Sequence, residues 1–324
     1  MRRRCWLQSA PSLSLAQERS AARATGAIRG PCPEPPACPE PPGGADLSDS
    51  APHPDPAHPA PGTPAAAGEV PAAAPRGLRP TLRRLWRFAL VLACVLYALL
   101  LAPLAFARPD PGPIAQHWFR LFARVIGLRI RVQGQPQAAP RLLVGNHISF
   151  FDIIVVCASV PVIFVSKDDV QRWPVVGLLT RAAKTLFIAR GGHATEALRA
   201  AILGRLRAGH RVVIFPEGTT STGESLRRFQ PRLFAVAIDG AVQVQPFALH
   251  YRQASVAYVE GSPSLLAVLW ACLGQAHTPV HLHFGPQLPA LEQRKAYAQA
   301  AQDWVATELA AMHARWPRGP GGPL

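Results

Sequence analysis

The sequence predicts an α/β fold in which a mixed sheet is wrapped by helices, with an N-terminal membrane-embedded helical segment before it. Two observations predict this architecture. From residue 129 onward, short apolar and β-branched runs alternate with longer segments of helical periodicity, which is typical of strands connected by helices. Before that point, residues 88–106 form one long apolar run without a charged residue, as expected of a helix in a membrane.

Residues 1–78 are rich in proline, alanine and glycine and show almost no apolar periodicity. Such a segment cannot bury enough apolar surface to offset the entropy lost on folding, so we expect a disordered tail. It is not typical of a signal peptide, because no continuous apolar stretch follows the basic residues 2–4. We expect three further parts: a membrane-associated helical hairpin or anchor at 79–128, the α/β domain at 129–315, and a flexible C-terminus at 316–324.

The apolar run has 19 residues and would span about 28 Å as a helix, close to the hydrocarbon thickness of a bilayer. A basic flank precedes it, made of Arg79, Arg83, Arg84 and Arg87. Basic flanks of membrane segments usually face the cytoplasm. We therefore expect the protein at the inner, cytoplasmic membrane.

Two arrangements of this segment remain open. A single span would place the α/β domain on the far side of the membrane, away from cytoplasmic substrates. A re-entrant hairpin would keep the domain in the cytoplasm, with residues 114–126 as its return leg. This leg places Trp118 and Phe122 on one side and Arg120 and Arg124 on the other, as in an amphipathic helix at a membrane interface.

Within the domain, periodicity and turn residues predict each element in order. The expected strands are residues 130–132, 142–144, 162–165, 185–188, 212–215, 242–247, 255–259 and 280–284. The expected helices are residues 152–159, 175–183, 194–208, 226–238, 264–273 and 291–314.

Residues 146–152 (Asn-His-Ile-Ser-Phe-Phe-Asp) follow an expected strand and lead into an expected helix. On one continuous helix, residues five apart would point about 140° away from each other. His147 and Asp152 can therefore meet only if the chain turns between them, with Asp152 near the start of the helix. An Asp bonded to one imidazole nitrogen leaves the other nitrogen as a general base. Asp152 is also suited to capping the helix N-terminus, and the two roles are compatible.

Residues 215–220 (Phe-Pro-Glu-Gly-Thr-Thr) form a turn after another expected strand. Open α/β sheets bind their ligands at the carboxyl ends of their strands. This turn is therefore a candidate ligand site, in which Gly218 would allow backbone N–H groups to approach an anion. Arg190 ends a third strand, and its guanidinium matches the geometry of a phosphate.

These segments, in this order, resemble the glycerolipid acyltransferase family, whose best-known members acylate lysophosphatidic acid at its sn-2 hydroxyl. The family's NHxxxxD, FIxR, FPEGT and Val-x-Pro motifs match residues 146–152, 187–190, 215–219 and 244–246. The resemblance covers about residues 80–290. It implies a glycerol-3-phosphate acyltransferase-like fold and makes residues 129–315 a catalytic domain.

The resemblance also implies roles for the candidate residues. His147 and Asp152 would be catalytic, and the acceptor would be bound by Arg190, Glu217, Gly218 and Thr219. The acyl donor would be acyl-CoA or acyl-ACP, transfer would be direct, and no cofactor or metal would be needed. The partners would be a membrane lipid acceptor, the acyl carrier and an anionic membrane surface.

Two positions depart from the family pattern, since the family often has an acidic residue at Ala189 and an arginine at Thr220. The missing arginine removes one expected contact to a phosphate. Lysophosphatidic acid is the first acceptor that we expect, and lyso-ornithine lipid, whose headgroup is an amino acid, is the alternative. A function of a different class is a non-catalytic protein that binds anionic lipid.

The net charge is +15 and the pI is near 10.8. No nucleic-acid-binding motif accompanies this charge, and arginines that face anionic headgroups beside a membrane segment explain it better. The six cysteines show neither metal-binding spacing nor a disulfide framework. His277, His281 and His283 lie close in sequence, but without a matching carboxylate or thiolate we expect them to serve strand packing rather than a metal site.

Overall fold

The computed structural model describes residues 77–138, 141–167, 172–188, 194–257 and 264–319. All of these residues belong to one compact unit. Almost all of the expected disordered tail, and the candidate residue Arg190, lie outside the described residues. The expected flexible C-terminus is described only as far as Gly319.

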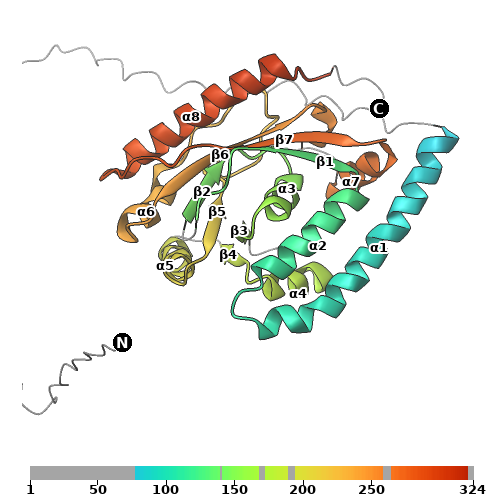
Figure 1. Cartoon of the computed structure of the whole chain (residues 1–324), viewed down its shortest axis with the longest axis horizontal. Helices are drawn as coiled ribbons and strands as arrows, with labels where there is room; N and C mark the ends of the chain where they lie inside the picture. Colours follow the sequence, from blue (N-terminus) through green and yellow to red (C-terminus); the bar gives the residue numbers. More distant parts are fainter. Residues whose placement is uncertain (1–76, 139–140, 168–171, 189–193, 258–263, 320–324) are drawn as a thin grey trace, which may run out of the picture. The chain divides into compact units, whose positions relative to one another are not determined.

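A seven-stranded sheet forms the centre of this unit, with the strand order β1-β7-β6-β2-β5-β3-β4 (Figure 1). The strands are β1 (Leu128–Gln133), β2 (Arg141–Gly145), β3 (Ile163–Lys167), β4 (Leu186–Ile188), β5 (Arg211–Ile214), β6 (Val244–Tyr251) and β7 (Thr278–Phe284). Neighbouring strands are parallel, except that β6 and β7 are antiparallel. The predicted mixed sheet is therefore confirmed.

Helices cover both faces of the sheet. One face packs against α2 (Gly112–Val125), α3 (Phe151–Ser159) and α7 (Leu265–Gly274), and the other against α5 (Ala194–Arg207), α6 (Ala235–Asp239) and α8 (Arg294–Arg315). In β2, Leu143 joins the first core, whereas Leu142 and Val144 join the second. Because side chains alternate between two buried faces, the central strands are apolar throughout.

An N-terminal helix, α1 (Leu78–Ala107), packs against α2, α7 and α4 (Pro174–Ala182). It is long and apolar enough to cross a membrane. The helix begins ten residues before the apolar run at 88–106, so it also contains the basic flank. Near its other end, Ala102 and Ala105 pack with Ala182 of α4, so α1 contacts the domain at both ends.

Two arginines of α1 bind carbonyls at the end of α7. Arg83 Nη1 donates to the carbonyl of Gly274 at 3.0 Å, and Arg87 donates to the carbonyls of Gln275 at 2.6 Å and Ala276 at 2.9 Å. Free carbonyls at a helix C-terminus attract cations. Contact of this basic flank with anionic headgroups stays a prediction.

Two expected elements are not formed. The helix expected at residues 226–238 is reduced to a 3-10 turn, Pro231–Phe234, followed by α6. Ahead of Pro231, backbone N–H groups bond to distant partners, since Phe229 donates to Gln302 Oε1 at 2.8 Å and Gln230 to the carbonyl of Pro216 at 3.0 Å. A proline also disfavours helical geometry in the residue before it.

The strand expected at residues 255–259 begins instead as a 3-10 turn, Ala254–Val256, and residues 258–259 lie outside the described part. The preceding strand, β6, already pairs with β2 on one side and β7 on the other. A further strand at this point would have no sheet edge beside it.

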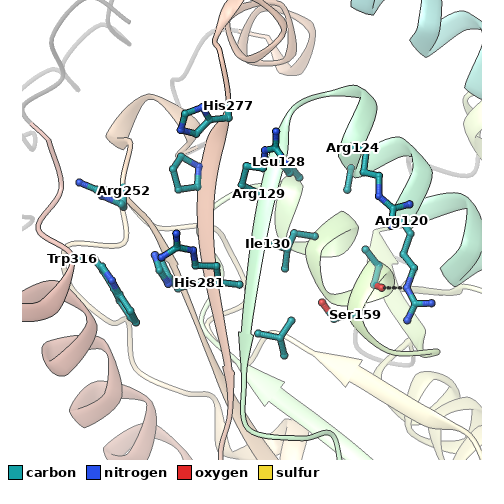
Figure 2. Close-up of a pocket in the computed structure, with 15 residues that line it drawn as sticks. Arg120, Arg124, Leu128, Arg129, Ile130, Ser159, Arg252, His277, His281 and Trp316 are labelled. Atoms are coloured by element: carbon teal, nitrogen blue, oxygen red, sulfur yellow. Dashed lines mark hydrogen bonds between the residues drawn. The ribbon is translucent and has the colours of Figure 1, made fainter.

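An open groove of about 800 Å³ borders β1, an edge strand of the sheet (Figure 2). Residues of α2, β1 and β7 line it, together with Arg252 and Trp316. None of its lining residues belongs to the four sequence motifs.

Candidate active site

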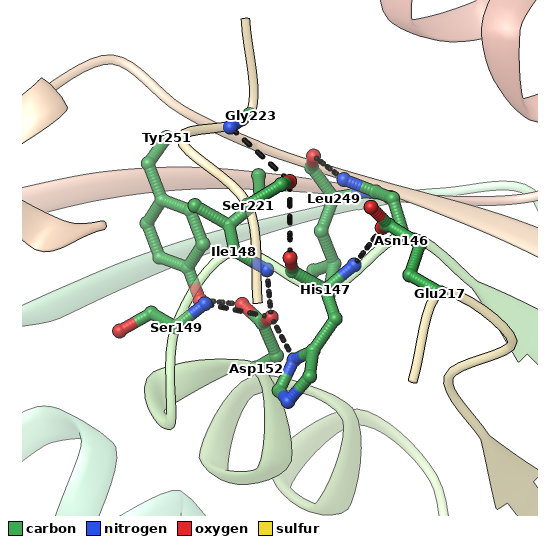
Figure 3. A network of polar contacts seen from close by, with 10 residues as sticks. All are labelled: Asn146, His147, Ile148, Ser149, Asp152, Glu217, Ser221, Gly223, Leu249 and Tyr251. Atoms are coloured by element: carbon green, nitrogen blue, oxygen red, sulfur yellow. Dashed lines mark hydrogen bonds and ion pairs between the residues drawn. The ribbon is translucent and has the colours of Figure 1, made fainter. Parts of the chain in front are cut away.

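The two most informative motifs meet because they follow neighbouring parallel strands. Val144 of β2 is aligned with Ile214 of β5, and the motifs at 146–152 and 215–220 begin within two residues of these positions. Both therefore lie at the carboxyl edge of the sheet, where their residues form one polar network (Figure 3).

Asn146 fixes the start of this network to the next strand. Its side-chain amide donates to the carbonyl of Leu249 at 2.9 Å, and its Oδ1 accepts from the Leu249 N–H at 2.8 Å. The side chain thereby replaces a backbone partner for β6 just beyond the end of β2. It is buried, and both of its polar groups are satisfied, as a buried amide requires.

His147 and Asp152 form the expected contact, with 2.8 Å between Nδ1 and Oδ2. The same Oδ2 accepts from the backbone N–H groups of Ile148 at 2.7 Å and Ser149 at 3.0 Å. The carboxylate thus holds the turn and the imidazole together. An ionised carboxylate on Nδ1 favours the tautomer that carries its proton there and leaves Nε2 as the basic nitrogen.

Asp152 lies in the first turn of α3 but does not cap the helix. The N-cap position is Phe150, which has no side-chain capping bond. Both N–H donors to Asp152 precede the helix, so its carboxylate organises the turn instead. The capping role considered from the sequence is therefore wrong.

Tyr251 completes the surroundings of the carboxylate. Its hydroxyl donates to Asp152 Oδ1 at 2.8 Å, and both side chains are fully buried. The hydroxyl comes from the end of β6, 99 residues along the chain from Asp152. Asp152 therefore accepts four hydrogen bonds and is held in one position by two elements.

The His147 ring packs against the protein on one side and is partly exposed to solvent. It stacks on Phe215 with a centroid distance of 4.0 Å and an interplanar angle of 9°. Its side chain is 19% exposed, whereas that of Asp152 is 0% exposed. Within the described residues, Nε2 has no hydrogen-bond partner. The basic nitrogen is thus open to a substrate hydroxyl.

Glu217 supports the backbone of the motif containing His147. Its Oε1 accepts from the His147 N–H at 2.6 Å, and its Oε2 accepts from the Arg227 N–H at 3.1 Å. Burial raises the pKa of Glu217 to about 7, although the two backbone donors favour its ionised form. Because both oxygens already have partners, the carboxylate serves the protein itself in this structure.

The loop after Glu217 is tied to the same motif. Gly218 has a φ of 75°, and its N–H donates to the carbonyl of Phe215 at 3.1 Å. The N–H of Ser221 donates to the carbonyl of His147 at 2.8 Å. Thr219 is half-buried between these two anchored positions. The structure therefore brings His147, Asp152, Glu217, Gly218 and Thr219 together, while Arg190 lies outside the described residues.

The acyltransferase family matches residues 129–250. A lyso-ornithine lipid O-acyltransferase of Pseudomonas aeruginosa is 35% identical over 236 residues, which cover 68% of this chain and 92% of that protein. The chain belongs to the acyltransferase family.

Two further relatives agree with this assignment. A 1-acyl-sn-glycerol-3-phosphate acyltransferase of Neisseria meningitidis serogroup B is 31% identical over 186 residues, covering 55% of this chain and 72% of that protein. The crystal structure of the 1-acyl-sn-glycerophosphate acyltransferase PlsC from Thermotoga maritima has a TM-score of 0.58 and 19% identity, covering 74% of this chain and 98% of that one. The second likeness confirms the fold.

Ser149 and Cys157 lie close in sequence to His147 and Asp152, but neither is suited to form an acyl-enzyme. The hydroxyl of Ser149 is buried without a hydrogen-bond partner, and Figure 3 shows it pointing away from the His147 ring. Cys157 is buried in α3, and burial raises the pKa of its thiol well above the usual value, which makes it a poor nucleophile. Neither side chain is placed for activation by His147.

The histidines of β7 contact α8 and the residue that follows it. The ring of His281 stacks on Trp316 at 3.7 Å between centroids, and His283 Nδ1 lies 2.7 Å from Glu308 Oε1. Within the described residues, no three His, Cys, Asp or Glu side chains are grouped as a metal site. These contacts account for His281 and His283 as packing residues between the sheet and a helix.

Sequence reasoning did not identify Tyr251 or the backbone role of Glu217. Tyr251 lies in an apolar strand, where a tyrosine resembles any other aromatic core residue. Its hydrogen bond to Asp152 depends on the placement of β6 beside β2. The signal that could have found it is a buried phenol, because a buried hydroxyl needs a hydrogen-bond partner.

Proposed function

We propose that this acyltransferase moves a fatty acyl group from a thioester donor to the hydroxyl of a membrane lysolipid, with lyso-ornithine lipid as its first acceptor. One observation carries the reaction type. It is the His147–Asp152 pair, in which Nδ1 is bound at 2.8 Å and Nε2 has no partner among the described residues. Such a base can deprotonate a hydroxyl directly.

In the proposed mechanism, His147 Nε2 takes the proton from the acceptor hydroxyl as its oxygen attacks the thioester carbonyl. The bond between the carbonyl carbon and sulfur then breaks, and the proton passes from His147 to the departing thiolate. An ester and a free thiol are the products. Asp152 would stabilise the positive charge on the imidazole during the reaction. The chemistry requires only the side chains of the protein, the lipid and the donor.

The choice of acceptor rests on one position and on the relatives. Thr220 stands where the family often has an arginine, which removes a cation suited to a phosphate. The Pseudomonas aeruginosa relative that carries the name lyso-ornithine lipid O-acyltransferase is 35% identical, and the Neisseria meningitidis relative named for the glycerophosphate acceptor is 31% identical. We therefore rank lyso-ornithine lipid before lysophosphatidic acid, the reverse of the order expected from the motifs.

We further propose that α1 lies within one leaflet of the inner membrane, with the domain on the cytoplasmic side. Helix α1 contacts α7 near its start and α4 near its end, so a perpendicular crossing by α1 would carry α4 or α7 into the bilayer. Exposed apolar side chains occur along α1 and on its neighbours α4 and α7, among them Leu96, Leu100, Val175, Leu266 and Trp270. Large exposed apolar areas favour contact with lipid.

The test is thiol release by purified protein in lipid nanodiscs, with oleoyl-CoA and either lyso-ornithine lipid or lysophosphatidic acid. We expect activity with lyso-ornithine lipid and its loss in His147→Ala. A matched control is His210→Ala, since His210 precedes β5 at the opposite edge of the sheet. Activity on lysophosphatidic acid alone would reverse the order of acceptors. Full activity in His147→Ala would refute the mechanism.

A further inference from the structure

The groove beside β1 carries an unusual excess of positive charge. Its lining contains no Asp or Glu but includes Arg120, Arg124, Arg129, Arg131, Arg252, His277 and His281 (Figure 2). Within the described part of the chain, none of these five arginines forms an ion pair. Arg120 has a partial partner, since its Nε donates to the carbonyl of Ala158 at 2.9 Å. Several uncompensated cations in one concave site favour an anionic ligand.

Two of the groove arginines, Arg131 and Arg252, act on the same buried histidine in its wall. The pKa of His281 is lowered, first by burial and then by the positive charges of Arg131, Arg252 and Arg315. His281 also pairs in register with Arg131 across β7 and β1. Residues paired in this way lie side by side on one face of a sheet.

The groove extends around the free edge of β1. Leu128 and Ile130 pack into the core that includes α2 and α3, so Arg129 and Arg131 project from the opposite face. That face also carries Trp316, whose ring stacks on His281. Arg120 and Arg124 of α2 supply charge from the first face. None of the lining residues that the structure describes belongs to α1, α4 or α7.

A row of core residues lies between the groove and the candidate active site. Tyr251, which binds Asp152, is aligned with Val280, and Val280 is aligned with Ile130 in the groove wall. Two strand spacings, roughly 10 Å, separate the ends of this row. Arg252, also in the wall, directly follows Tyr251. A ligand that reacts at His147 and places charge in the groove must be extended.

Building on the proposed function, we infer that this groove binds the phosphate groups of a coenzyme A thioester. In such a donor, the pantetheine arm separates the reacting thioester from the phosphates, as the geometry requires. A volume of about 800 Å³ suits a small molecule rather than a protein surface. An anionic lipid headgroup has similar chemistry, but it would approach from the side of α1, which carries the exposed apolar residues.

The experiment compares oleoyl-CoA with oleoyl-pantetheine, which has the same thioester but no phosphate. The variant Arg131→Gln/Arg252→Gln removes two exposed charges from the groove. Arg294→Gln is the matched control, because Arg294 is exposed at the start of α8, about 30 Å along the helix from Trp316. We expect the double variant to raise the KM for oleoyl-CoA about tenfold and to leave kinetics with oleoyl-pantetheine and the KM for the lipid acceptor unchanged.

Other results would overturn the inference. An unchanged KM for oleoyl-CoA would remove the groove from donor binding. A raised KM for the acceptor, or weaker binding to vesicles with anionic lipid and equal donor kinetics, would assign the groove to a lipid headgroup.

Titration calorimetry with free coenzyme A separates this inference from the proposed function. Binding that the double variant weakens, in a protein without acyl transfer, would uphold the phosphate site and refute the function. If the protein transfers acyl groups but wild type and double variant bind coenzyme A with equal affinity, the function is upheld and the phosphate site is refuted.

Discussion

At the scale of single residues, the candidate active site is organised around the buried carboxylate of Asp152. It accepts hydrogen bonds from the imidazole of His147, from two backbone N–H groups and from the hydroxyl of Tyr251. Hydrogen bonds to charged groups contribute about 1.5–3 kcal/mol each. A carboxylate with four donors is fixed in orientation, and so is the imidazole that it holds.

Tyr251→Phe tests whether this positioning matters for turnover. The change removes one donor to Asp152 and retains the ring, so we expect kcat to fall about tenfold, corresponding to about 1.4 kcal/mol, with KM unchanged. Steady-state kinetics of thiol release measure this. Tyr297→Phe is the matched control, because Tyr297 is a buried tyrosine of α8 in the opposite core. An equal effect of both changes would mean that only packing is involved.

Glu217 predicts a pH dependence of stability. Its pKa of about 7 in the folded protein exceeds the ordinary value of 4.5, so the folded state holds the proton more tightly than the unfolded state. The free energy of unfolding should therefore decrease as pH rises from about 4.5 to about 7 and level off above it. Denaturant unfolding between pH 5 and 8 measures the effect. Glu217→Gln cannot titrate at this position. The difference between its free energy of unfolding and that of wild type should therefore change with pH up to about 7 and stay constant above it.

At the scale of elements, the turn after β5 depends on Gly218. A side chain at its positive φ costs about 1–2 kcal/mol, and an added Cβ would collide with the Gln230 side chain. We expect Gly218→Ala to lower thermal stability and to reduce activity by displacing the loop bound to His147. Gly204→Ala is the control, because Gly204 lies in α5 with open space around it, and alanine there should stabilise the helix by up to about 1 kcal/mol. Equal melting temperatures for the two variants would contradict the prediction.

The short apolar helix α7 predicts a contact with lipid beyond α1. Leu266 and Trp270 are 70% and 40% exposed and lie one turn apart. We expect Leu266→Gln/Trp270→Gln to weaken vesicle binding several-fold in a co-sedimentation assay with unchanged folding. A double change of the exposed Ala306 and Ala310 of α8 to glutamine is the control. Vesicle binding as tight as in wild type would show that α7 does not meet the membrane.

At the scale of the whole molecule, α1 is held to the domain by polar as well as apolar contacts. Arg87 donates to three carbonyls at the end of α7, those of Leu273, Gln275 and Ala276. We expect Arg87→Ala to speed amide exchange in the first turns of α1 by at least tenfold, since charged hydrogen bonds of about 1.5 kcal/mol or more are lost. Arg79→Ala is the control, because Arg79 is exposed on the same helix without a polar contact among the described residues. Equal exchange in both variants would refute this docking.

The α/β class, most of the strands and helices, and the contact between His147 and Asp152 are predictable from the amino-acid sequence alone. These features depend on local information. Apolar periodicity fixes the elements, and a turn of five residues is short enough to bring base and carboxylate together without help from the rest of the chain. The acyltransferase family followed from four short motifs for the same reason.

Contacts between residues that lie far apart in the chain depend instead on how the elements pack. Tyr251 reaches Asp152, and Arg87 reaches the end of α7, because of strand order and helix packing, which no local pattern encodes. Other long-range hydrogen bonds explain why no helix forms ahead of Pro231. There, the backbone N–H groups of Phe229 and Gln230 donate to acceptors that are distant in the chain. A buried N–H needs a hydrogen-bond acceptor. Here the acceptors come from distant parts of the chain instead of from a helical turn.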